Sequence, residues 1–226
     1  MVVIDVLNEP GGMDLLANRY GLRKVPVLAK GDQVAIGQML DPFAKLAGLP
    51  MPGAQRLSPE QLYKKYALVF TCGQRLARQF PADRFRERVI PHRERLIRTL
   101  CYHVFRIGEA FLETWGGAEY GAKIADNEPP ESLAGGDDVA RYGASVWARY
   151  EVWWQSLPLD ERALSKVLKT YYGDTAAHQV FERVAWHSAQ HCRQLAAVLE
   201  SMNVMPDRPL TPEDLAGLPL PDRLWE

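Results

Sequence analysis

The sequence predicts a mainly α-helical protein, a four-helix bundle preceded by a small N-terminal α/β unit. After about residue 50, apolar residues recur with helical spacing in four long segments separated by Pro- and Gly-containing loops. Before it, short β-rich runs alternate with helix-like segments. We therefore expect three parts: an N-terminal unit (1–52), a helical bundle (53–205) and a proline-rich C-terminal arm (206–226).

The N-terminal unit is expected to have the order βαββα. Turn chemistry separates its elements: Gly31-Asp32 suits a tight turn, and Asp41 followed by Pro42 is a typical helix start. The expected elements are a strand in VVIDVL (2–7), a helix from Gly12 to Tyr20, a strand in VPVLA (25–29), a strand in QVAIG (33–37) and a helix ending at Gly48.

The bundle helices follow the linker LPMPGAQRL (49–57). Ser58-Pro59-Glu60-Gln61 is a capping box with proline in the first turn, which predicts a helix start. Helices are expected at about 58–80, 91–115 and 137–157. A short helix or an irregular segment is expected near 159–169. The long final helix is expected to begin at Gly173-Asp174-Thr175. The arm contains five prolines and is expected to be extended.

Composition excludes several classes of protein. The net charge is −1 and charged residues make up 24%, so no overall field favours nucleic acid or membrane surfaces. No apolar run is long enough to span a bilayer, and the N-terminus lacks a signal-peptide pattern. Three well-separated cysteines are typical of free thiols in a reducing compartment. We expect a cytoplasmic protein that acts on a small molecule.

Three histidines occupy positions that should face the core. His187 and His191 are one helical turn apart in the last long helix, and His103 has the same phase in an earlier helix. The two apolar stripes are Val180, Val184, His187, His191, Leu195, Val198, Met202 and Leu96, Leu100, His103, Ile107, Ala110. Neutral imidazoles bind Zn²⁺, and also Ni, Fe or Mn ions. The pattern predicts a divalent-metal site, although a buried histidine can also be a hydrogen-bonded core residue.

Other residues are expected to be structural. His92 and His178 should lie at the surface. The eight arginines between Arg75 and Arg98 should form a solvated, partly salt-bridged surface, with binding of the carboxylates of an anionic thiol as the alternative for some of them. Cys192 directly follows His191, and Cys101 lies two residues before His103. Because successive residues of a helix point about 100° apart, both thiols are expected to face away from the metal. A helical run of aromatics should fill the core or a dimer interface, with a pocket lining as the alternative: Trp147, Tyr150, Trp153 and Trp154.

Residues 54–205 resemble the DinB/YfiT-like superfamily of metalloenzymes. The resemblance rests on the lone inward histidine of one helix and on His187-Ser-Ala-Gln-His191-Cys-Arg-Gln194 in the last. It implies a four-helix bundle, often dimeric, whose metal is held by His103, His187 and His191, with Gln194 where members often have glutamine. Better understood relatives, mycothiol-dependent maleylpyruvate isomerase and bacillithiol S-transferases, depend on small thiols that the metal is thought to activate.

Residues 1–50 resemble the C-terminal part of a glutaredoxin or thioredoxin. Lys24-Val25-Pro26-Val27-Leu28, a turn, a second strand and a helix carry the resemblance. It implies a cis Val25-Pro26 bond at a thiol-binding groove for glutathione or a peptide. The segment contains no cysteine, so it cannot itself exchange disulfides. Either the gene begins upstream, or the unit has become a docking surface, or it is simply a structural cap.

The sequence therefore predicts a metal-dependent transferase or isomerase that uses glutathione or another small thiol. Two alternatives stay open: a hydrolase that activates water at the same metal, and a non-catalytic bundle stabilised by metal, with the N-terminal unit used for docking or thiol binding.

Overall fold

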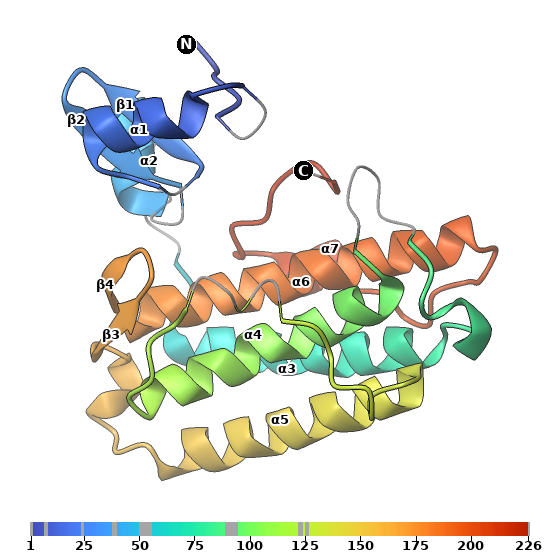
Figure 1. The fold of residues 1–226 in the computed structure, drawn as a ribbon. Coiled ribbons are helices and arrows are strands. Elements are labelled where there is room, and N and C mark those ends of the chain that lie inside the picture. The colour runs from blue at the N-terminus through green and yellow to red at the C-terminus, as the bar shows by residue number, and fades with distance from the viewer. Residues whose placement is uncertain are drawn as a thin grey trace. The chain divides into compact units, whose positions relative to one another are not determined.

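The computed structural model describes residues 2–6, 9–23, 25–37, 40–49, 56–88, 95–121, 124 and 127–225. These form two compact units, Met1–Arg56 and Leu57–Glu226, which are described separately. Both are drawn in Figure 1. The protein is mainly helical, with two small two-stranded sheets.

The N-terminal unit contains a β-hairpin flanked by two helices. Its elements are α1 (Gly12–Tyr20), β1 (Val27–Lys30), β2 (Gln33–Ile36) and α2 (Leu40–Ala47). The strands are antiparallel, with Val27 opposite Ile36 and Lys30 opposite Gln33. Gly31 between them has φ +62°, a conformation that glycine adopts without a steric penalty. These four elements agree with the predictions.

The predicted first strand is wrong. Residues 2–6 are irregular, and the side chains of Val2 and Val3 are 87% and 79% exposed. A strand needs a partner for its backbone groups, and β1 and β2 form a sheet of two strands only, so no described strand is placed beside residues 2–6. Their β-propensity alone was therefore misleading.

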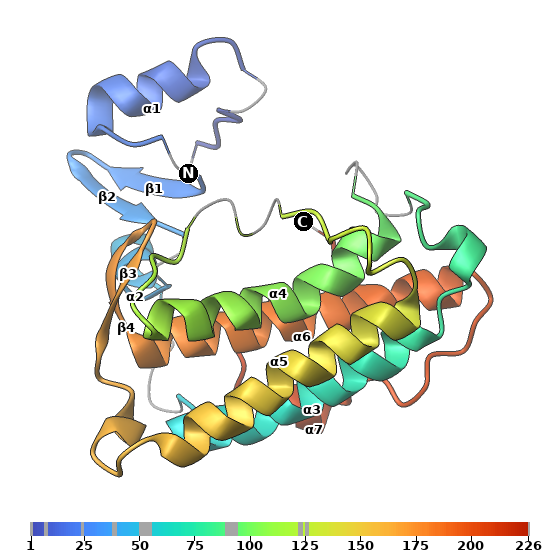
Figure 2. The same cartoon turned by 60° about the horizontal axis from the view of Figure 1, so that its bottom comes forward.

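The second unit contains four long helices that run side by side (Figure 2). They are α3 (Pro59–Arg78), α4 (Ile97–Trp115), α5 (Gly136–Ser156) and α6 (Ala177–Ser201). Both α3 and α4 pack against α5 and against α6. Within the described part of the chain, no helix combines the length and apolar character needed to cross a membrane.

Local sequence explains where these helices begin. Ser58 Oγ accepts a hydrogen bond from the Gln61 N–H, and Gln61 Oε1 accepts one from the Ser58 N–H, which confirms the predicted capping box. Helix α4 begins later than predicted, because Leu96 is extended and forms a bridge with Arg88. The predicted start of that helix, at Pro91, lies outside the described residues.

A second hairpin precedes α6, where the sequence predicted a helix start. It consists of β3 (Val167–Thr170) and β4 (Gly173–Ala176), which pair antiparallel. In β3 buried and exposed side chains alternate, which is the pattern of a half-buried strand, whereas no strand is expected here from the sequence. A short 3-10 helix, η3 (Glu161–Ala163), lies in the preceding segment. This agrees with the first of the two structures expected there, a short helix or an irregular segment.

Aromatic side chains fill much of the bundle core. Several are fully buried and contact one another across the helices: Tyr66, Phe70, Phe105, Phe111, Tyr150 and Phe181. Of the predicted aromatic run, Tyr150 and Trp153 are buried, whereas Trp147 and Trp154 are half-buried and pack against Tyr63. Such contacts add to the apolar area that stabilises the bundle.

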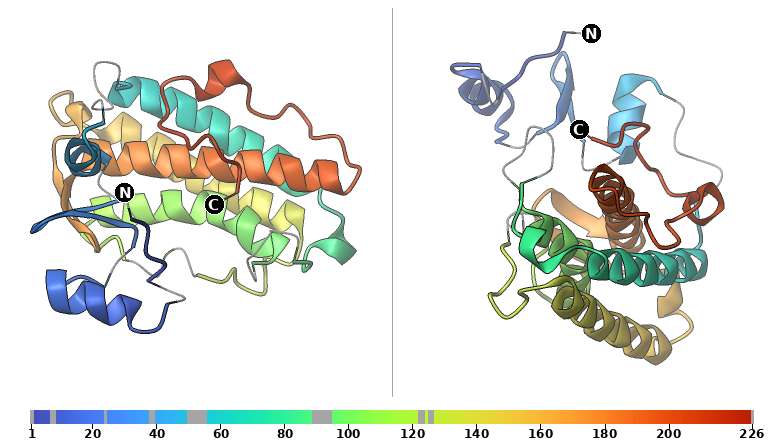
Figure 3. Two further views of the ribbon diagram at one scale, coloured as in Figure 1. Left: turned by 90° about the horizontal axis from the view of Figure 1, so that it is seen from above. Right: turned by 90° about the vertical axis from the view of Figure 1, so that its right-hand side faces the viewer.

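The C-terminal arm follows the bundle surface, passing over α3 and ending beside the middle of α6 (Figure 3). It contains a short helix, α7 (Pro212–Leu215), capped by Thr211. Side chains of α3 and of its C-cap residue bind the backbone of the arm: Gln79 accepts from the Asp207 N–H, and Lys65 donates to the Glu213 and Asp214 carbonyls. The arm is thus attached along its length by hydrogen bonds to main-chain atoms.

Candidate metal centre

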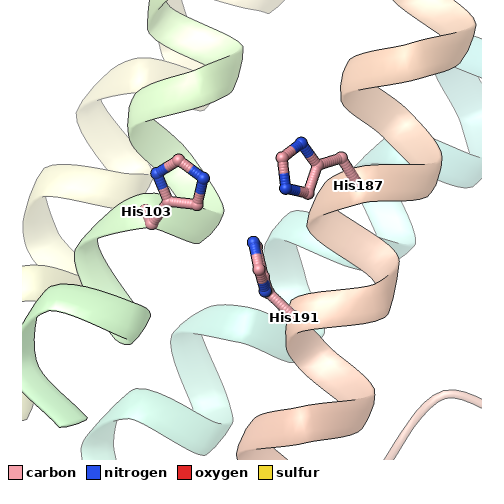
Figure 4. A group of neighbouring side chains, drawn as sticks. All are labelled: His103, His187 and His191. Atoms are coloured by element: carbon pink, nitrogen blue, oxygen red, sulfur yellow. The ribbon is translucent and has the colours of Figure 1, made fainter. Parts of the chain in front are cut away.

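The structure brings His103, His187 and His191 together between two helices. His103 projects from α4, and His187 and His191 project from α6 toward it (Figure 4). The stripe around His103 is buried as expected, since Leu100, Ile107 and Ala110 are each 1% exposed. The helical phase read from the sequence therefore places all three imidazoles at one contact between α4 and α6.

The three rings are close enough to act on one ligand. Their centroids are 5.2 Å apart for His103 and His187, 4.9 Å for His103 and His191, and 4.6 Å for His187 and His191. One nitrogen from each ring can be chosen so that all three lie within 4.8 Å of one another. Nitrogens that share one zinc ion can be at most about 4.2 Å apart, so small ring rotations would bring the three onto one ion.

Ser188 fixes the two helices at the level of this cluster. Its hydroxyl donates to the Val104 carbonyl at 2.7 Å and lies 3.2 Å from the hydroxyl of Tyr66. Ser188 directly follows His187, and Val104 directly follows His103, so the bond joins the two helices beside the imidazoles. Ser188 is completely buried, and a buried hydrogen bond of this kind is costly to break.

Burial favours the neutral form of His103 and His187. It lowers the pKa of both His103 and His187 well below the usual value, and the neighbouring imidazole of His191 lowers it further. Charges from Arg95, and from Arg106 or Arg183, act in the same direction. Neutral imidazoles are the form that binds metal, so neither His103 nor His187 has to lose a proton to bind an ion near pH 7.

The buried imidazole of His103 has both ring nitrogens available to bind a ligand. It is 1% exposed, and neither of its ring nitrogens has a hydrogen-bond partner among the described residues. A buried polar group without a partner usually costs about 1–3 kcal/mol. An ion bound between the three rings would satisfy one of these nitrogens, so the residues present fit a divalent metal.

Gln194 orients the third histidine. The Nδ1 atom of His191 lies 2.7 Å from Gln194 Oε1, one helical turn along α6. The distal nitrogen of His191 points toward the space between His103 and His187 (Figure 4). A hydrogen bond to the other ring nitrogen is the usual way in which proteins set the orientation of a metal-binding imidazole.

One side of the cluster is accessible to solvent. His187 is half-buried, as are Arg183 and Trp186 on the same part of α6. The rings of Trp186 and His187 stack with centroids 5.6 Å apart, and the Arg183 guanidinium lies over the rings of Tyr172 and Trp186. A small molecule approaching His187 would therefore meet a cation and an aromatic surface. Arg183 precedes His187 by one turn, but nothing in the sequence pattern marks it as part of the site.

The cysteines lie outside this cluster, as predicted. Cys192 is buried and its thiol is directed at the Val69 carbonyl on α3, 3.6 Å away. Cys101 is buried, and burial raises its pKa. His178, expected at the surface, is half-buried, and its Nε2 lies 2.9 Å from the Leu57 carbonyl. His92 lies outside the described residues.

The arginine-rich segment is largely a surface of ion pairs, with one exception. Arg84 pairs with Glu87, and Arg86 pairs with Glu131. Arg98, in contrast, is 3% exposed and donates to the carbonyls of Leu133, Pro129 and Pro130, so the prediction that it is solvated is wrong. Its five N–H donors suit a loop that presents several carbonyl groups on one side, which a sequence pattern does not reveal.

Val25 and Pro26, the candidate thiol-groove residues, lie in the N-terminal unit. Their peptide bond is cis, the isomer that the glutaredoxin resemblance implies. Val25 is half-buried and Pro26 is exposed. The Pro26 carbonyl accepts a hydrogen bond from the Gly37 N–H at 2.8 Å, which extends the hairpin by one bond.

The chain was compared with family models, curated proteins and solved structures, and none of them matches it.

Proposed function

We propose that the bundle holds one divalent metal ion at His103, His187 and His191 and acts as a metal-dependent enzyme on a small thiol. The observation that carries the proposal is the convergence of three imidazoles from two helices, with the pKa of two of them lowered by burial. Zinc fits three histidines with an open position, and nickel, iron and manganese ions are alternatives.

The charges around the site favour an anionic partner. Three neutral imidazoles leave the ion its full positive charge, and the cationic Arg95 and Arg183 also act on this cluster, whereas the charge of Arg106 is matched by Glu109 and Glu113. A divalent ion in such a site lowers the pKa of a thiol or water molecule that takes its open position. A thiolate that also bears carboxylates, as in glutathione, would suit both the ion and the Arg183 side of the site.

The protein's own thiols are poorly placed for this role. Cys72, Cys101 and Cys192 are all buried and none belongs to the histidine cluster. The thiolate would then come from a small molecule, which agrees with the thiol-dependent chemistry implied by the resemblance to DinB/YfiT-like proteins. That resemblance also supports a transferase or isomerase rather than another reaction class.

Metal content provides the first test. Protein purified without a polyhistidine tag and loaded with Zn²⁺ should retain about one ion per chain after gel filtration. A His187→Ala, His191→Ala double variant should retain none, while His178→Ala, a histidine elsewhere on α6, should behave as the wild type. Absence of bound metal after loading with zinc, nickel, iron and manganese would reject the proposal.

Thiol binding provides the second test. Glutathione should raise the thermal midpoint of the metal-loaded protein, whereas S-methylglutathione, which keeps the carboxylates but has no thiol, should raise it much less. The metal-free protein should respond to neither. Equal shifts with both compounds would show that the thiol group does not reach the metal.

A further inference from the structure

The last residues of the C-terminal arm are bound to the helical turn that carries His191. Gln194 Nε2 donates to the Leu224 carbonyl at 2.9 Å, and Gln190 Nε2 donates to the same carbonyl at 2.8 Å and to the Arg223 carbonyl at 3.1 Å. Arg193 Nη1 donates to the Pro221 carbonyl at 3.0 Å and to Gln190 Oε1 at 2.8 Å. Three side chains of one turn thus bind the backbone of the arm.

These hydrogen bonds determine which nitrogen of His191 carries the proton. A backbone carbonyl can only accept, so the Leu224 oxygen requires the NH₂ group of Gln194 to face it. The amide oxygen of Gln194 must then face His191, and because that oxygen can only accept, His191 Nδ1 must donate. The lone pair of the imidazole is consequently on Nε2, which points toward the other two histidines.

We propose that the C-terminal arm contributes to metal binding: the Leu224 carbonyl orients the Gln194 amide, and the Gln194 amide orients His191 toward the metal. This inference rests on the proposed metal-binding function. Without the arm, the Gln194 amide can turn over and present its NH₂ group to His191, which places the lone pair of the imidazole on Nδ1, away from the other histidines. The arm thereby selects the tautomer that binds metal.

The acceptors on the arm are main-chain atoms, so a side-chain substitution there would not remove them. A chain ending at Leu220 lacks all three carbonyl groups that bind this turn and leaves the described ligands intact. Gln194→Ala removes the intermediate group, and Gln194→Glu keeps an acceptor for His191 Nδ1 but cannot donate to Leu224. Gln79→Ala is the matched control, because it removes the hydrogen bonds to Met205 and Asp207 at the start of the arm, beside the C-terminal end of α3.

Zinc dissociation constants, measured by competition with a chromogenic chelator, should separate these variants. The truncated chain and Gln194→Ala are expected to bind zinc about 10- to 100-fold more weakly than the wild type, the usual effect of losing such a hydrogen bond. Gln194→Glu should bind within a few-fold of the wild type, and Gln79→Ala should be unchanged. A purely structural role for the arm would weaken binding equally in Gln79→Ala and in the truncated chain.

Nitrogen NMR of the metal-free protein tests the tautomer directly. His191 should be protonated at Nδ1 in the wild type and should show a mixture of tautomers in the truncated chain and in Gln194→Ala. Unchanged zinc affinity and an unchanged tautomer in the truncated chain would overturn the role of the arm while leaving the metal site in place. Failure of the wild type to bind metal, with the tautomer as expected, would instead reject the metal-binding function.

Discussion

Gly143 of α5 lies so close to the ring of Phe105 in α4 that a Cβ atom added to it would come within 2.7 Å of a ring carbon. Phe105 is fully buried and lies two residues beyond His103, so this contact sets how closely α5 can approach the helix that carries one of the histidines. The backbone of α5 thus packs directly against the aromatic core.

Gly143→Ala should destabilise the protein by about 1–3 kcal/mol, because a methyl group would overlap a ring that is packed on all sides. Denaturant unfolding of the metal-free protein measures the change. Phe105→Leu in the same chain should recover part of the loss by making room for the methyl group. Gly121→Ala, where no atom lies within 4 Å of the added Cβ, is the control. Equal effects at both glycines would show that the loss does not come from crowding against Phe105.

Removal of metal should lower the stability of the loaded protein. A ligand that binds the folded chain alone stabilises it by about 2.7 kcal/mol when its free concentration is 100 times the dissociation constant. Adding excess EDTA to zinc-loaded protein should therefore lower its thermal midpoint to that of the metal-free form. The same addition should leave His103→Ala unaffected, and a response of that variant equal to the wild type would place the metal elsewhere.

Stability should decline at high pH because of buried tyrosines. Burial raises the pKa of Tyr150 well above 10, and the neighbouring Tyr66 raises it further. The folded state then keeps a proton that the unfolded state releases above about pH 10, so stability falls as the pH rises beyond that value, by at most about 1.4 kcal/mol per pH unit for one such group. Below pH 10 both states are protonated and this effect vanishes.

Tyr150→Phe provides the comparison for the alkaline loss. The variant loses the hydrogen bond from Tyr150 to the Gly108 carbonyl, so it should be less stable at neutral pH. Its stability should nevertheless fall less steeply between about pH 10 and pH 11.5 than that of the wild type. Parallel pH profiles of the two proteins, measured by urea unfolding, would contradict the assignment.

The start of α3 depends on its capping box. Ser58→Ala should cost about 0.5–2 kcal/mol, since it removes the oxygen that accepts from the Gln61 N–H. Ser58→Asp should retain most of the stability, because aspartate also caps helices well. Thermal midpoints of the two variants test this. A destabilisation of Ser58→Asp as large as that of Ser58→Ala would show that the serine is needed for another reason.

Local patterns predicted most of the helices and the histidine cluster. Turn and cap residues gave the starts of α2 and α3, and the helical phase of His103, His187 and His191 placed them on the faces where the structure finds them. This works because both signals lie within a few residues along the chain.

Features that depend on distant residues could not be predicted in this way. The strand expected at 2–7 would have required a partner that no local pattern supplies. The β3–β4 hairpin could have been recognised from the alternation in Val167–Thr170, but Gly173-Asp174-Thr175 is also typical of a helix start. Gln190 and Gln194 look like ordinary polar residues, because their role comes from carbonyl groups about 30 positions further along the chain.

The positions of the ligands along the chain also have a consequence for folding. His103 and His187 are 84 residues apart in the sequence, the same separation as Val104 and Ser188. The intervening segment includes all of α5. An ion held there would act as a cross-link that closes this loop. For a loop of that length, the chain-entropy model of a covalent cross-link gives about 4–5 kcal/mol. Metal would thus favour the assembled order of helices over any arrangement in which α4 and α6 are apart.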